Sequence, residues 1–159
     1  MGKIAIGASR GQSVRVGSPS SVIKVLWQLF KQAGWAPFLV VVLHRIVMLC
    51  GWRKYVVFDW ILHFTGGLAI AYFLFYLIPY FEARIGKLTR AARLALTYTS
   101  ACTVAAFWEL AEFAASFSRG TVLQHSLSET MVDLLNGVVG AAITVVVLAI
   151  SGRGREERG

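Results

Sequence analysis

Long apolar runs dominate the pattern of hydrophobic and polar positions along the chain. A helix needs roughly 20 apolar residues to cross a hydrocarbon core of about 30 Å. Four stretches approach this length, at residues 36–52, 56–81, 91–117 and 131–150. The pattern therefore predicts an all-α, polytopic integral membrane protein built as a four-helix transmembrane bundle.

The stretch before the first run has a different pattern. Residues 21–33 place apolar side chains at helical spacing, with lysines and glutamines on the other side, which is typical of an amphipathic helix lying on a membrane surface. Gly34 and Pro37 interrupt the pattern and separate this interfacial helix from the first run. Residues 1–20 are polar, basic and rich in Gly and Ser, which predicts a disordered leader.

Composition agrees with one membrane domain. The chain has 159 residues, 57% of them hydrophobic, and a net charge of +8. Its basic residues lie in short clusters beside the apolar runs rather than along one soluble face, so we expect membrane lipids as partners and no nucleic acid. Phosphate-binding loops and soluble nucleophile motifs are absent from the sequence. A homo-oligomer or a membrane-protein partner remains open.

The distribution of Lys and Arg predicts how the helices are oriented, because cytoplasmic segments carry an excess of these residues. With the N-terminus inside, twelve fall on the cytoplasmic side and three outside, while Arg45 lies within a span. Both termini are then cytoplasmic, including a charged tail at residues 152–159. The twelve are Lys3, Arg10, Arg15, Lys24, Lys31, Arg84, Lys87, Arg90, Arg93, Arg153, Arg155 and Arg158; the three are Arg53, Lys54 and Arg119.

Ionisable residues inside the runs come in pairs that share a helix face. Such residues are costly in lipid and are functional candidates by default. The pairs are Asp59 with His63, Glu109 with Glu112, and Asp133 with Asn136, and Glu129 lies one turn before the last pair. On the predicted topology they all fall within roughly 5 to 15 Å of the outer helix ends. His44 and Arg45 reach a similar depth, so we expect a polar cluster in the outer leaflet.

This cluster supports three hypotheses. In the first, Arg45, His44 and His63 neutralise the carboxylates in a buried network, and the protein is a scaffold or an envelope-associated partner. In the second, membrane carboxylates with a nearby His relay protons in a transporter or channel. Whether the protein is an enzyme is left open by the sequence.

The third hypothesis is a metal site. Helical bundles build carboxylate and His sites from inward-facing pairs of this kind, and the oxygen-rich set favours Mg²⁺, Mn²⁺, Ca²⁺ or iron. The protein would then act on a lipid head group or an envelope precursor, with Glu109 or Glu112 as general base. The candidate ligands are Asp59, His63, Glu109, Glu112, Glu129 and Asp133.

Three motifs in order also resemble a known family. They are Asp59-Trp-Ile-Leu-His63-Phe-Thr-Gly-Gly, Phe107-Trp-Glu109-Leu-Ala-Glu112-Phe and Glu129-Thr-Met-Val-Asp133-Leu-Leu-Asn136-Gly-Val-Val-Gly140-Ala. Together they resemble the YjdF-like family of bacterial inner-membrane proteins and, more distantly, the VanZ-like family. The resemblance implies a compact polytopic fold in the bacterial inner membrane, and for VanZ-like proteins a link to glycopeptide-antibiotic tolerance. The sequence departs from the VanZ-like pattern in lacking a Lys after Asp59 and in carrying Glu112 and Glu129.

Overall fold

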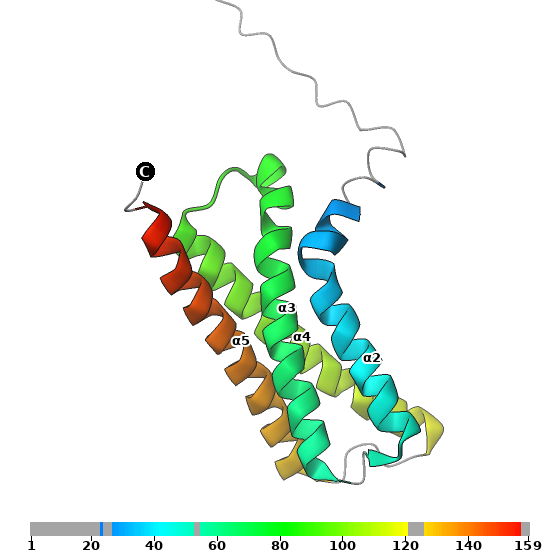
Figure 1. Cartoon of the computed structure of the whole chain (residues 1–159). Helices are drawn as coiled ribbons and strands as arrows, with labels where there is room; N and C mark the ends of the chain where they lie inside the picture. Colours follow the sequence, from blue (N-terminus) through cyan, green and yellow to red (C-terminus); the bar gives the residue numbers. More distant parts are fainter. Residues whose placement is uncertain (1–22, 24–26, 53–54, 121–125, 157–159) are drawn as a thin grey trace, which may run out of the picture.

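The computed structural model describes residue 23 and residues 27–52, 55–120 and 126–156. In this part of the chain the helices are η1 (Phe30–Gly34), α2 (Trp35–Leu49), α3 (Val56–Ile85), α4 (Arg90–Arg119) and α5 (Leu127–Glu156). Successive long helices run in opposite directions, so the start of α2 and the end of α5 lie at the same end of the bundle (Figure 1). We call this end, with the α3–α4 turn, the Arg93 end, and the opposite end the His63 end.

The first helix differs from the sequence expectation of two separate segments. Trp27–Leu49 is one helical stretch, and its widened π-helical turn, Phe30–Gly34, continues directly into α2. Pro37 lies in the first turn of α2, and a locally widened ladder is one way in which a helix accommodates a residue without a backbone N–H. Gly34 is buried against Phe30. The expected leader at residues 1–20 lies outside the described residues.

Three of the described helical stretches are long and apolar enough to cross a membrane: Trp27–Leu49, Val56–Glu82 and Leu127–Ser151. The four-span expectation is thus supported in part. Helix α4 has 30 residues and the necessary length. Its composition is less apolar, because Arg90 and Arg93 open it, Glu109 and Glu112 interrupt its second half, and hydroxyl residues occupy much of its middle.

Helices α3 and α5 approach each other backbone to backbone. A Cβ added at Gly67 would overlap the carbonyl oxygen of Gly137, and one added at Gly140 would overlap the carbonyl oxygen of Phe64. The Thr144 hydroxyl donates a hydrogen bond across the same contact to the Leu68 carbonyl at 3.2 Å. Small residues permit such close packing where the hydrophobic effect offers no driving force between helices. This close backbone contact holds α3 and α5 together.

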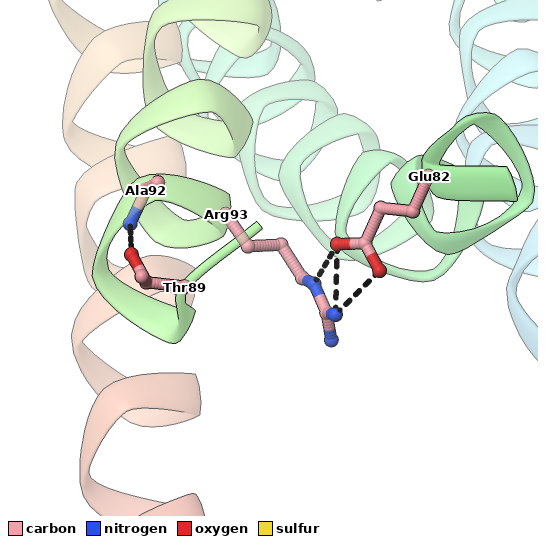
Figure 2. A network of polar contacts seen from close by, with 4 residues as sticks. All are labelled: Glu82, Thr89, Ala92 and Arg93. Carbon is pink, nitrogen blue, oxygen red and sulfur yellow. Dashed lines mark hydrogen bonds and ion pairs between the residues drawn. The ribbon is translucent and has the colours of Figure 1, made fainter. Parts of the chain in front are cut away.

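A polar network ties α4 to its neighbours at the Arg93 end (Figure 2). The Arg93 guanidinium donates to both carboxylate oxygens of Glu82, at 2.8 to 3.0 Å. Arg90 donates to two carbonyls of α5, Leu148 at 2.8 Å and Ala149 at 3.0 Å. The Thr89 hydroxyl caps α4 by accepting from the Ala92 N–H at 3.2 Å. These bonds connect α3, α4 and α5 within one helical turn of the loop.

The long helices extend past the apolar runs that predicted them. The second run was expected at residues 56–81 and its helix ends at Ile85; the third was expected at 91–117 and the helix covers Arg90–Arg119. The fourth was expected at 131–150, whereas α5 begins at Leu127 and continues to Glu156, into the charged tail. Hydropathy marks the part of a helix in lipid, while caps and turns set where it ends.

Candidate functional site

His63 is the centre of a polar cluster at the His63 end, where α3 begins, α4 ends and α5 begins. Its two ring nitrogens face different carboxylates. Nδ1 lies 3.2 Å from Oε1 of Glu109 on α4, and Nε2 lies 3.9 Å from Oδ1 of Asp59, one turn earlier on α3. The imidazole therefore connects a carboxylate of its own helix with one from a neighbouring helix.

The cluster contains two overlapping groups of metal-ligating side chains. One is Asp59, His63 and Asp133, and the other is His63, Glu109 and Glu112. Within each group, one ligand atom from each residue lies within 4.8 Å of the others. The structure thus brings together five of the predicted site residues from three helices, and His63 belongs to both groups.

The cluster is mostly enclosed by the bundle. The side chains of His63 and Glu109 are 9% and 7% exposed, and Asp133 is buried as well. Asp59 is more open, with 21% of its side chain exposed, and Glu112 is half-buried. The set combines four carboxylates with one imidazole, so its formal charge is negative if all four are ionised. Asp59 and Glu112 are therefore the more exposed members of the cluster.

Two predicted members lie elsewhere. Glu129 is in neither ligand group; its backbone N–H donates to the Ser126 side chain at 3.1 Å at the start of α5. Arg45 is exposed on α2 and forms no ion pair with any residue in the described ranges. The expected neutralisation of the cluster by Arg45 is therefore not seen.

The remaining two residues of the expected polar cluster are His44 and Asn136. The ring of His44 makes an edge contact with Trp108 of α4, at 5.9 Å between ring centroids, next to Glu109 in the chain. Asn136 is half-buried on α5, one turn after Asp133.

Hydroxyl residues of the helices mostly bond to their own backbone. Thr65 donates to the Ile61 carbonyl at 2.6 Å, Thr99 to Ala95 at 3.0 Å and Thr103 to Thr99 at 2.9 Å. Thr97 is fully buried, and its hydroxyl has no hydrogen-bond partner within the described part of the chain. These bonds are the ordinary way in which a hydroxyl is satisfied inside a helix, so the geometry does not favour a relay through them.

An apolar groove of about 490 Å³ lies between α2, α3 and α5. Its walls include Trp35, Tyr72, Thr144 and Leu148. None of the five clustered residues lines it, so the groove and the polar cluster are separate features.

Sequence reasoning missed two local signals that the structure makes plain. Ser126-Leu-Ser-Glu129 is a capping-box sequence, which would have placed Glu129 at a helix start. Glu82 and Arg93 flank a short loop of four residues, 86–89, which favours a pair between antiparallel helices. Arg93 enters the sequence prediction only as a topology signal, and Glu82 does not enter it.

Comparison with known proteins gives one match. Residues 22–154 match a family described as predicted membrane protein (DUF2238). No curated protein and no solved structure matches the chain.

Proposed function

We propose that this chain, which belongs to the DUF2238 family of membrane proteins, holds a divalent cation within the membrane at the cluster around His63. One observation carries the proposal: three helices bring ligand atoms of five His, Asp and Glu residues into two groups in which every atom lies within 4.8 Å of the others. The three helices that contribute them are far apart in the sequence, and the five side chains converge on one imidazole.

The spacing of the ligand atoms suits a small cation. Metal to oxygen or nitrogen distances of about 2.0 to 2.2 Å place opposite ligands about 4.4 Å apart and neighbouring ligands nearer. The 3.9 Å separation of His63 Nε2 and Asp59 Oδ1 falls within that range. Neither group contains a Cys, so an oxygen-rich site for Mg²⁺, Mn²⁺, Ca²⁺ or iron is favoured.

The charge of the cluster supports the same proposal. Four carboxylates in a medium of low dielectric constant repel one another strongly, and a protonated His63 offsets one charge. A divalent cation offsets two and allows the carboxylates to remain ionised. The alternative of a purely structural network in a scaffold counts on Arg45, His44 and His63 to balance the carboxylates, and of these Arg45 is exposed on α2.

The proposed topology has four membrane crossings. Helix α4 links α3 to α5 from one end of the bundle to the other (Figure 1), so it crosses with them, and its acidic residues face the cluster. The positive-inside rule then places the Arg93 end in the cytoplasm of a bacterial inner membrane, with the cluster in the outer leaflet. We also propose that the chain is related to the YjdF-like family and, more distantly, to the VanZ-like family.

The chemistry that such a site suits is hydrolysis or transfer at a lipid head group. A bound cation would polarise a phosphoryl oxygen or supply a hydroxide at neutral pH. Glu112 is only half-buried, and it is the carboxylate we propose as general base. Glu109 and Asp133 are buried and would keep bulk water away from the bound cation.

The direct test is metal content of the gently purified protein, measured by mass spectrometry for the native chain and for His63→Gln. Because His63 belongs to both ligand groups, we expect stoichiometric metal in the native protein and its loss in the variant. His44→Gln is the matched control, since it removes an imidazole at a similar depth outside both groups. Absence of metal from well-folded native protein, even after incubation with Mn²⁺ or Fe²⁺, would overturn the proposal.

A further inference from the structure

We infer that the cation is bound at Nε2 of His63, with Asp59 and Asp133 as its other protein ligands, and that Glu109 is a positioning residue that accepts the Nδ1–H. The inference rests on the proposed function and divides the cluster into ligands and support. It assigns the two nitrogens of one ring to two different tasks.

The two distances at the ring differ in the way this division requires. Nδ1 and Glu109 Oε1 are 3.2 Å apart, an ion-pair contact at hydrogen-bond distance in which no hydrogen bond from Nδ1 to Oε1 is yet formed. Nε2 and Asp59 Oδ1 are 3.9 Å apart, too far for a direct hydrogen bond and suitable for two ligands on either side of a cation. A metal-bound His nearly always donates its other N–H to a carboxylate or carbonyl, which fixes the tautomer and the ring orientation.

The scaffold also favours the α3 and α5 residues as ligands. Gly67 lies one turn after His63, and it touches Gly137, which lies one turn after Asp133. Two backbones in contact this near the site hold His63 and Asp133 at a fixed separation. A metal site needs its ligands placed within about 0.5 Å, and the α3–α5 contact supplies that precision.

Helix α4 packs against α5 near the site, where Ala105 lies beside Gly137, and its side-chain hydrogen bonds to α3 and α5 lie at the other end of the bundle. Those bonds are made by Arg90 and Arg93, on the first turn of a helix in which Glu109 comes 19 residues after Arg90. At about 1.5 Å per residue this is close to 30 Å away. Glu109 is buried and near enough to orient the imidazole, which is a role that tolerates small movements of its helix.

Metal titration of full-length variants in detergent, with Mn²⁺ detected by electron paramagnetic resonance, tests the division. We expect Asp133→Asn to abolish stoichiometric binding. Glu109→Gln keeps an acceptor oxygen for Nδ1–H, and we expect it to retain one site with about 10- to 100-fold weaker affinity. Glu129→Gln, a carboxylate outside both groups, should bind as the native protein does. Circular dichroism of each variant verifies folding.

A second readout locates the bound nitrogen directly. The chain has three His residues, so the ¹³C and ¹⁵N resonances of His-labelled protein can be assigned with His44→Gln and His63→Gln. On loading with Zn²⁺ as a diamagnetic probe, the Nε2 signal of His63 should shift while Nδ1 stays protonated.

The outcomes separate the two proposals. Zn²⁺ at Nδ1, or loss of stoichiometric Mn²⁺ in Glu109→Gln with retention in Asp133→Asn, would overturn this assignment and leave the metal site standing. Absence of any metal binding by the native protein would overturn both.

Discussion

The two ends of the bundle handle their charges in opposite ways. At the Arg93 end, the Arg93 guanidinium and the Glu82 carboxylate form a bidentate ion pair, and Arg90 donates to backbone carbonyls. At the His63 end, four carboxylates gather around one imidazole. An ion pair of one cation and one anion is sufficient to fix the register of two helices. A group of carboxylates with an excess negative charge is stabilised when a cation binds to it. The difference favours a structural role for the first end and supports the proposed binding role of the second.

The common scaffold of both ends is the α3–α5 contact, and altering it should have the largest effect. We expect Gly67→Ala to lower the free energy of unfolding by about 3 kcal/mol, because the new methyl group overlaps the Gly137 carbonyl and forces two helices apart. Metal binding should be lost as well, since His63 and Asp133 separate. Denaturant titration in detergent and metal analysis would measure the two effects.

The adjacent glycine is the matched control. A Cβ at Gly66 meets only a Val40 methyl at 3.9 Å, so Gly66→Ala should be neutral or stabilising by about 0.5 to 1 kcal/mol in a helix interior. Equal destabilisation by both substitutions would show that helix propensity, and not backbone contact, governs this region.

Metal addition should stabilise the protein through the His63 end. At a free metal concentration of 100 times Kd, binding to the native state adds about 2.7 kcal/mol. We expect this increment in the native protein and its absence in Asp133→Asn, measured by thermal unfolding with and without Mn²⁺. An increment of the same size in the variant would mean that the cation binds elsewhere.

The Arg93 end should respond in the reverse way. Arg93→Met leaves the Glu82 carboxylate, which is 10% exposed, without its guanidinium, and we expect a loss of about 2 kcal/mol because the Arg93 side chain is itself 27% exposed and partly screened. The double substitution Glu82→Leu with Arg93→Met should recover part of this loss. Metal affinity should stay unchanged in both, and a fall in affinity would contradict the separation of the two ends.

Much of this arrangement is visible in the sequence. Hydropathy predicts the apolar helices, and helical spacing combined with depth brings Asp59, His63, Glu109 and Asp133 to one level, where the structure does gather them. Their roles as ligands remain predictions. Depth alone does not tell which side of a helix faces the bundle, and so Arg45, at a similar depth, is exposed instead.

Other features depend on backbone geometry that periodicity does not encode. The helix from Trp27 to Leu49 continues past Gly34 and Pro37, because the turn before Trp35 widens into a π-helix. The overlap of Gly67 with Gly137 depends on how α3 and α5 cross. The sequence does predict close helix approach at Gly66, Gly67, Gly137 and Gly140, but it does not tell which of these glycines touch the other helix.

The smallest expected effect concerns the start of α5, which carries Asp133 into the site. Ser126 accepts a hydrogen bond from the Glu129 N–H at 3.1 Å, and Ser126→Ala should cost about 1 kcal/mol because one N–H of the first turn loses its cap. Asp133 lies two turns into the helix from Ser126, beyond the fraying first turn, and α5 is anchored nearby through Gly137. Metal affinity should therefore fall by less than about threefold, which thermal unfolding and Mn²⁺ titration of the same sample would measure. A tenfold or larger loss of affinity would mean that the α3–α5 contact does not hold Asp133 by itself, and that the metal site extends to the cap of its helix.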